Sequence, residues 1–151
     1  MGYLILIIAV VAADQIVKAI VSHAMALNES IPVIANVFHI TYVQNTGAAF
    51  SLLDGFRGFL IFLPVLVIGA ACVYVFRQRH TARPLLLAAV SLIVAGGLGN
   101  VANRIWLGYV VDYFDFRVFP VFNIADISIC VGCGLFLIAV LFTGGRRKKE
   151  T

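Results

Sequence analysis

The sequence predicts an all-α membrane protein with four transmembrane helices and a small β element on one side of the membrane. Of its 151 residues, 62% are hydrophobic and only 12% are charged, which is too little charge to cover a soluble domain of this size. Four apolar stretches approach the length of about 20 residues that a helix needs to cross a bilayer. One of the connections alternates apolar and polar residues, a pattern typical of a strand.

The first apolar stretch, residues 3–22, contains a polar group formed by Asp14, Gln15 and Lys18. Asp14 and Lys18 are four residues apart, so on a helix they share one face and can form an ion pair. Charged residues inside a span usually face the other helices and often have a function. We favour a structural ion pair over a catalytic one. The stretch lacks the basic start of a signal peptide, so we expect a retained membrane helix.

The other three stretches, residues 58–76, 84–103 and 127–145, contain no Asp, Glu, Lys or Arg. Each therefore fits a membrane helix. The third span contains the sequence GGLGN at residues 96–100, near its outer end. Glycines in membrane helices allow neighbouring backbones to approach closely. We therefore expect a tight helix–helix contact at this position.

Basic residues predict the orientation in the membrane. The short link between the second and third spans carries three arginines, Arg77, Arg79 and Arg83. Four more basic residues follow the fourth span at 146–149. Because basic loops stay on the cytoplasmic side, both termini are expected in the cytoplasm and the connections 23–57 and 104–125 outside it. The whole chain, 1–151, then forms a single four-span domain.

The first outer connection contains the predicted β element. Residues 36–45 place apolar side chains at alternate positions, which predicts a strand at the membrane surface; these side chains are Phe38, Ile40 and Tyr42. The sequence NTGAAFS at 45–51 has the residues of a turn. There Asn45 can bond to the local backbone, and Gly47 tolerates turn conformations.

Acidic residues cluster around the second outer connection, where Asp112, Asp115 and Asp126 lie within fifteen positions. Two carboxylates held close together do not both ionise easily, so one keeps its proton near neutral pH. Such a pair can activate water and protonate a leaving amine, as in an aspartic protease. The simpler alternative is that each acid caps a helix or contacts solvent. We expect the run 113–125 to be an interfacial loop that brings two of the acids together, with Asp115 facing solvent.

Polar residues at two span ends predict a pocket. Asp126 lies at the start of the fourth span, where a helix N-terminus favours a carboxylate, and Asn123 is a candidate cap for it. At the outer end of the third span, one helix face carries three polar residues, Asn100, Asn103 and Arg104. Polar groups at this depth are tolerated where they line a wet pocket rather than face lipid.

Other kinds of chemistry lack a sequence signal. There is no HExxH motif or Walker loop, and the three histidines are scattered. The pair Cys130 and Cys133 has metal-ligand spacing but no second pair of ligands. The net charge of +4 arises from short clusters beside apolar runs rather than from a basic surface. We therefore expect no metal, no cofactor and no nucleic-acid partner.

Five motifs, in order along the chain, resemble those of lipoprotein signal peptidase (signal peptidase II). They are DQIVK, QNTGAAFS, GGLGN with a following NR, VVDYF and FNIADISI, and they extend from Asp14 to Ile129. The resemblance implies an intramembrane aspartic endopeptidase of the bacterial inner membrane with a β-like cradle on the extracytoplasmic side. It further implies a diacylglyceryl-modified prolipoprotein as substrate, cleaved just before the lipidated cysteine, with membrane lipid and the inhibitor globomycin as further partners.

The resemblance also implies roles for individual residues. The catalytic pair falls on Asp112 and Asp126. The substrate-binding set comprises Asn45, Arg104, Asn100 and Asn123. The supporting set comprises Asp14, Lys18, Gly47 and Asn103.

One position departs from the family pattern, and two other functions stay open. The family usually has GN-x-x-D-R where this chain has GNVANR, so Asn103 replaces an aspartate. An amide keeps the size and hydrogen bonding of that residue but removes its negative charge beside Arg104. The alternatives are a small transporter or proton-conducting protein, and a non-catalytic homologue that binds prolipoproteins.

Overall fold

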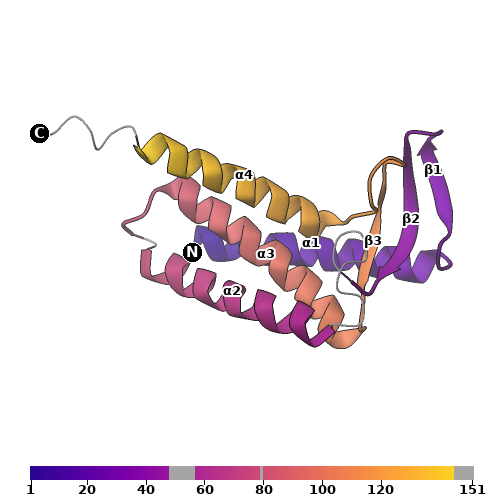
Figure 1. The fold of residues 1–151 in the computed structure, drawn as a ribbon, viewed down its shortest axis with the longest axis horizontal. Helices are drawn as coiled ribbons and strands as arrows, with labels where there is room; N and C mark the ends of the chain where they lie inside the picture. The colour runs from indigo at the N-terminus through magenta and orange to yellow at the C-terminus, as the bar shows by residue number, and fades with distance from the viewer. Residues whose placement is uncertain (48–56, 79, 145–151) are drawn as a thin grey trace, which may run out of the picture.

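The computed structural model describes residues 1–47, 57–78 and 80–144, and it contains four long helices and one small sheet (Figure 1). The helices are α1 (Gly2–Ala24), α2 (Arg57–Gln78), α3 (Pro84–Trp106) and α4 (Ile124–Gly144). The strands are β1 (Ser30–Ile34), β2 (Phe38–Asn45) and β3 (Val110–Asp115). All four helices are long and apolar enough to cross a membrane, so the predicted fold class is confirmed. Arg79, the basic tail at 146–149 and the second half of the NTGAAFS turn lie outside the described residues.

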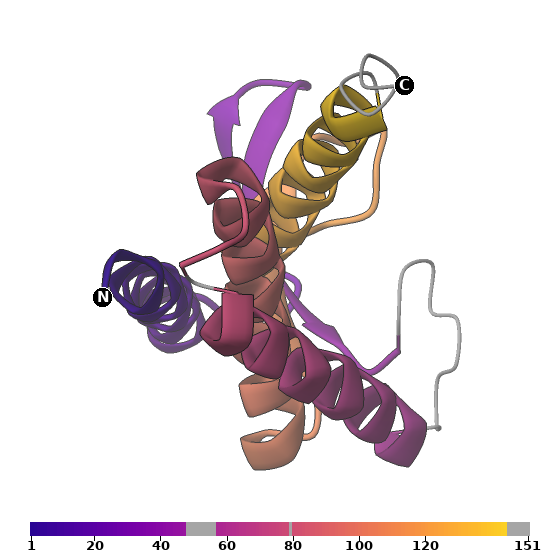
Figure 2. The ribbon, with the colours of Figure 1, turned by 90° about the vertical axis from the view of Figure 1, so that its left-hand side faces the viewer.

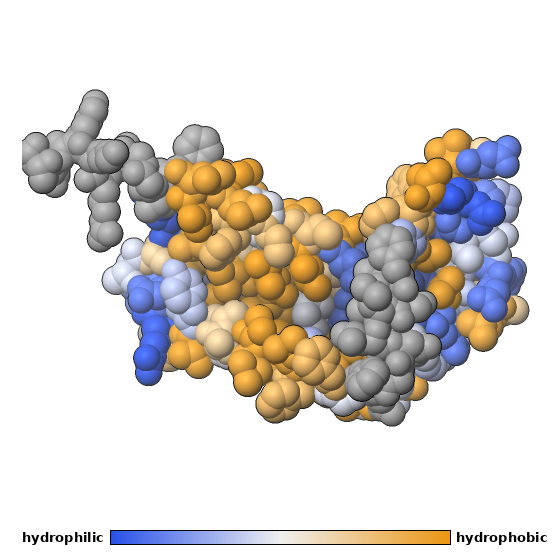
Figure 3. Space-filling model, viewed as in Figure 1, coloured by the Kyte–Doolittle hydropathy of each residue, from blue (hydrophilic) through white to orange (hydrophobic). Residues whose placement is uncertain are grey.

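The helix α3 is the centre of the bundle. It contacts α1, α2 and α4, and Figure 2 shows it between the other three. Many of its small and branched side chains are almost fully buried, among them Leu87, Ala89, Val94 and Ala95. The other helices expose large apolar side chains, including Leu4, Ile5, Phe62 and Leu141. On the face shown in Figure 3, hydrophobic residues cover the helices and hydrophilic residues gather towards the two ends, as expected for a protein surrounded by lipid.

Glycines set how closely the helices approach α3. A side chain on Gly96 would overlap the backbone carbonyl of Ala125 at the start of α4. A Cβ on Gly99 would lie 2.6 Å from a carboxylate oxygen of Asp14 in α1. The predicted close contact at GGLGN is therefore confirmed, and it brings α1 and α4 together against the outer end of α3.

The sheet lies at one end of the bundle, and its strands run antiparallel in the order β1-β2-β3. The predicted strand at 36–45 is confirmed as β2. The strand β3 pairs with β2 across a long sequence separation, with Val43 opposite Asp112 and Asn45 opposite Val110. The interpretation of 113–125 as a loop is therefore wrong at both ends: residues 113–115 are extended by backbone pairing with β2, and residues 124–125 already belong to α4.

Candidate active site

Asp112 lies on β3, which the chain enters directly after α3. Gly108 has a positive φ of 90° between the helix and the strand, a conformation that glycine adopts without strain. The Asp112 residue is 2% exposed, and each of its carboxyl oxygens has an amide donor. Asn45 Nδ2 donates to one oxygen at 2.9 Å, and Asn123 Nδ2 donates to the other at 2.7 Å. Pairing of β2 with β3 therefore gives Asp112 a fixed orientation.

The environment of Asp112 changes its acidity. The pKa of Asp112 is raised from 3.8 to about 6, chiefly because burial removes the hydration of the ionised form. Within this net change, the hydrogen bonds from Asn45 and Asn123 lower the pKa by stabilising the ionised form, and the charge of Asp126 raises it. The result is a carboxyl group that keeps its proton to a higher pH than an exposed aspartate does.

Asp126 lies in the first turn of α4, where it forms a reciprocal cap with Asn123. The Asp126 N–H donates to Asn123 Oδ1 at 2.9 Å, and the Asn123 N–H donates to Asp126 Oδ2 at 3.1 Å. The predicted cap is thus present, and it explains why α4 begins at Ile124, three residues before the expected span.

The remaining N–H groups at the start of α4 also have partners. The first N–H groups of a helix have no acceptor within the helix itself. In α4, the Ile124 N–H donates to the Tyr113 hydroxyl at 3.2 Å, and the Ala125 N–H donates to Asp14 Oδ1 at 3.0 Å. Side chains from β3 and α1 therefore fix the helix turn that carries Asp126.

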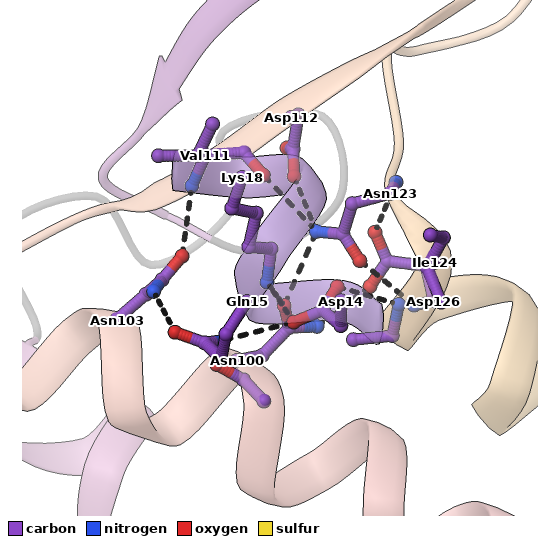
Figure 4. A network of polar contacts seen from close by, with 12 residues as sticks. Asp14, Gln15, Lys18, Asn100, Asn103, Val111, Asp112, Asn123, Ile124 and Asp126 are labelled. Atoms are coloured by element: carbon purple, nitrogen blue, oxygen red, sulfur yellow. Dashed lines mark hydrogen bonds and ion pairs between the residues drawn. The ribbon is translucent and has the colours of Figure 1, made fainter. Parts of the chain in front are cut away.

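Two asparagines connect the two acids (Figure 4). Asn100 Nδ2 donates to Asp126 Oδ1 at 2.7 Å. Asn123 Nδ2, which bonds Asp112, also lies 3.1 Å from Asn100 Oδ1. Side chains that are distant in sequence therefore hold both carboxyl groups in one hydrogen-bonded cluster.

The predicted ion pair in α1 contacts this cluster through Asn100. Lys18 Nζ lies 2.9 Å from Asp14 Oδ2, and both side chains are buried. Lys18 Nζ also donates to Asn100 Oδ1 at 2.8 Å. Because that oxygen accepts from the ammonium group, the amide nitrogen of Asn100 is directed at Asp126. The pair therefore connects α1 to the acids through Asn100 (Figure 4).

Asn103 and Arg104 have different surroundings, although they are adjacent. Asn103 is buried behind the cavity, where it donates to Gln15 Oε1 at 3.0 Å and accepts from the Val111 N–H at 3.3 Å. Arg104 lines the cavity, and its Nη2 donates to the carbonyl of Gly47 at 2.8 Å. Gly47 also donates its N–H to Asn45 Oδ1 at 3.0 Å, which confirms the local bond expected of Asn45. Arg104 therefore has a bonding partner that does not depend on a carboxylate at position 103.

A cavity of about 430 Å³ opens beside the acids. Its lining includes five of the predicted site residues, Asn45, Asn100, Arg104, Asp112 and Asp126. Aromatic and proline residues of the 116–122 segment form much of the remaining wall. A second cavity of about 240 Å³ adjoins it and is almost entirely apolar, lined by Phe119, Phe122, Asp126, Ile127, Cys130 and Val131. Asp126 thus lies between the two cavities, whereas Asp112 lines only the larger one. The other predicted site residues, which do not line either cavity, are Asp14, Lys18, Gly47, Asn103 and Asn123.

Asp115 is not the solvent-facing residue that its sequence position suggested. It is 5% exposed and accepts hydrogen bonds from Thr41 Oγ1 at 2.8 Å and from the Arg117 backbone N–H at 2.8 Å. Burial by itself would raise the pKa of Asp115, but these bonds and the Arg117 guanidinium outweigh it and hold the pKa below 3.8. Neither cavity includes Asp115 in its lining, so it belongs to the sheet rather than to the site.

Sequence reasoning gave no site role to two residues of this network. Gln15 joins Asp14, Gly99 and Asn103 by hydrogen bonds, and its polarity within an apolar span was the available signal. Tyr113 contacts the start of α4 through its hydroxyl, and no local pattern indicates this.

The chain is similar to known proteins both in sequence and in structure. The family model described as Signal peptidase (SPase) II matches residues 6–142. The chain is 45% identical over 138 residues to the lipoprotein signal peptidase of Halothermothrix orenii, which covers 91% of this chain and 93% of that relative. It is 38% identical over 154 residues to the lipoprotein signal peptidase of Moorella thermoacetica, covering 99% of each. A solved structure of a bacterial membrane enzyme is similar with a TM-score of 0.91 and 33% identity, covering 99% of this chain and 93% of that one.

Proposed function

Because this chain belongs to the signal peptidase II family, we propose that it is an aspartic peptidase that cleaves diacylglyceryl-modified prolipoproteins just before the lipidated cysteine. Family membership and the four apolar helices make it a multi-pass membrane protease that removes signal peptides. The observation that carries the aspartic mechanism is the pair Asp112 and Asp126, joined through two asparagines at the wall of one cavity.

In the proposed mechanism the two acids have different roles. Asp126 acts as the base and accepts a proton from a water molecule, which attacks the carbonyl carbon of the scissile peptide bond. Asp112, whose pKa is raised to about 6, donates its proton to the departing amine as the carbon–nitrogen bond breaks. The asparagines keep both carboxyl groups oriented, which reduces the reorganisation needed to reach the transition state.

The two cavities suit the two parts of the substrate. The larger cavity offers Asn45 and Arg104 as donors for peptide carbonyl groups next to the cleaved bond. The adjoining apolar cavity lies along Ile127, Cys130 and Val131 of α4, and two of these side chains, Ile127 and Val131, are 41% and 48% exposed on the lipid-facing side. An acyl chain attached to the cysteine can therefore remain in apolar surroundings while the peptide reaches the acids.

The proposed site faces the extracytoplasmic side, with both termini in the cytoplasm. The sheet and the acids lie at one end of the bundle, and the link between α2 and α3 lies at the other (Figure 1). Arg77 and Arg83 flank that link, and the positive-inside rule assigns it to the cytoplasm. Cysteine labelling from either side of sealed vesicles tests this orientation.

A cleavage assay with a diacylglyceryl-modified prolipoprotein tests the mechanism. Asp112→Asn and Asp126→Asn should each abolish cleavage while the protein still inserts into the membrane. Asp115→Asn, a third acid of the same region that lies outside both cavities, is the matched control and should retain cleavage. Substantial cleavage by either of the first two variants would refute the aspartic mechanism. Globomycin binding without any turnover by the wild type would instead indicate a non-catalytic homologue.

A further inference from the structure

Tyr113 follows Asp112 directly on β3, and its side chain reaches the start of α4. The residue is 1% exposed and packs in a cluster with Val21, Tyr42 and Val111. Its hydroxyl oxygen accepts a hydrogen bond from the Ile124 N–H at 3.2 Å. Ile124 is the first residue of α4, two positions before Asp126.

The hydroxyl has a distinct place among the groups that satisfy the first turn of α4. The Ala125 N–H donates to Asp14 of α1, and the Asp126 N–H donates to Asn123, the residue directly before α4. Among the first backbone N–H groups of α4, that of Ile124 bonds to the strand that carries Asp112; just before the helix, Phe122 and Asn123 also bond to this strand. Burial raises the pKa of Tyr113, so the hydroxyl stays protonated and acts as a neutral acceptor. The strand β3 thus carries one acid and contacts the helix turn that carries the other.

We propose that Tyr113 is a positioning residue, which rests on the proposed function: its hydroxyl fixes the first turn of α4 against β3 and so sets Asp126 relative to Asp112. A buried N–H that loses its acceptor is costly, so the helix start shifts to find another partner. Tyr113 does not line either cavity, so in the proposal it acts through Asp126 rather than through contact with the substrate. Loss of its hydroxyl should change the chemical step and leave substrate binding intact.

The test is Tyr113→Phe, which removes one oxygen atom and keeps the aromatic ring in place. We expect kcat to fall about tenfold with KM within about twofold, because small displacements of a catalytic group reduce the rate without weakening binding. The matched control is Tyr42→Phe. Tyr42 is 5% exposed in the same cluster, but its hydroxyl accepts from Gln44 Nε2 at 2.9 Å rather than from α4. This control should keep the wild-type kcat.

Hydrogen exchange of the Ile124 amide supplies a readout that does not depend on cleavage. Tyr113→Phe should accelerate exchange at the start of α4, whereas Tyr42→Phe should not. Unchanged kcat and unchanged exchange in Tyr113→Phe would overturn the inference, as would an equal loss of kcat in both variants. If the aspartate variants abolish cleavage and Tyr113→Phe behaves as wild type, the inference alone fails. If Asp112→Asn still cleaves, the proposed function fails whatever Tyr113→Phe does.

Discussion

Asp112→Asn should stabilise the folded protein at alkaline pH while abolishing its activity. In the wild type the pKa of Asp112 is about 6 when folded, compared with 3.8 for an ordinary aspartate. The folded state therefore binds more protons than the unfolded state between these two values, and stability falls as pH rises through that range. Asparagine does not ionise, so the variant lacks this loss.

The size of the effect follows from the same two values. A difference between 3.8 and about 6 corresponds to roughly 3 kcal/mol, at about 1.4 kcal/mol per pH unit. Against this gain, the new NH2 group meets one of the two amide donors that now bond the carboxylate, from Asn45 and Asn123. One lost hydrogen bond costs about 1 kcal/mol. The variant should thus be more stable than wild type by about 2 kcal/mol at pH 8, and less stable by about 1 kcal/mol below about pH 3, where the carboxyl group is protonated in both states.

Thermal unfolding in detergent at several pH values measures this difference. The midpoint of Asp112→Asn should lie above that of the wild type at pH 8, and the two midpoints should cross as the pH falls below about 6. Taking the difference between variant and wild type removes the contributions of other titrating groups that the two proteins share. A difference that stays constant across this pH range would refute the reasoning, because it would mean that Asp112 has the same pKa in both states.

Three further predictions test the surroundings of the acids. Asn45→Leu removes a hydrogen bond that stabilises the ionised form of Asp112, so the alkaline limb of the profile of kcat/KM against pH should move to a higher pH than its wild-type position near pH 6. An unchanged alkaline limb would contradict the role of Asp112 as proton donor. Asp115→Asn should keep cleavage within about twofold but lower the free energy of unfolding at pH 7 by about 1 kcal/mol. This loss of stability should disappear as the pH falls below 3.8, because the folded-state pKa of Asp115 is depressed. Lys18→Met should lower the free energy of unfolding by at least about 3 kcal/mol, because it leaves the fully buried Asp14 without its cation. A thermal midpoint equal to that of the wild type would contradict this contribution of the ion pair to stability.

Features that depend on neighbouring residues were predictable from the sequence. The apolar stretches gave the four helices to within a few residues at most ends, because crossing a bilayer requires a continuous run of hydrophobic side chains. The cap between Asn123 and Asp126 was predictable for the same reason, since its partners are three residues apart. The pair of Asp14 and Lys18 lies on one helix face and formed as expected. The choice of Asp112 over Asp115, by contrast, came from the resemblance to a family and not from spacing.

The contacts that turn these parts into a site were decided only by the tertiary structure. Asn45 and Asp112 are 67 positions apart, and they meet because β2 pairs with β3 in one register. Asn100 meets Asp126 because glycines let α3 and α4 touch, and no local pattern sets the rotation of one helix against the other. The tertiary structure likewise buries Asp115 in the sheet and directs the Tyr113 hydroxyl to the start of α4. The sequence by itself determined which segments enter the membrane, because hydrophobicity is a local property. Only the fold determined which polar ends face one another, because that depends on how distant segments pack.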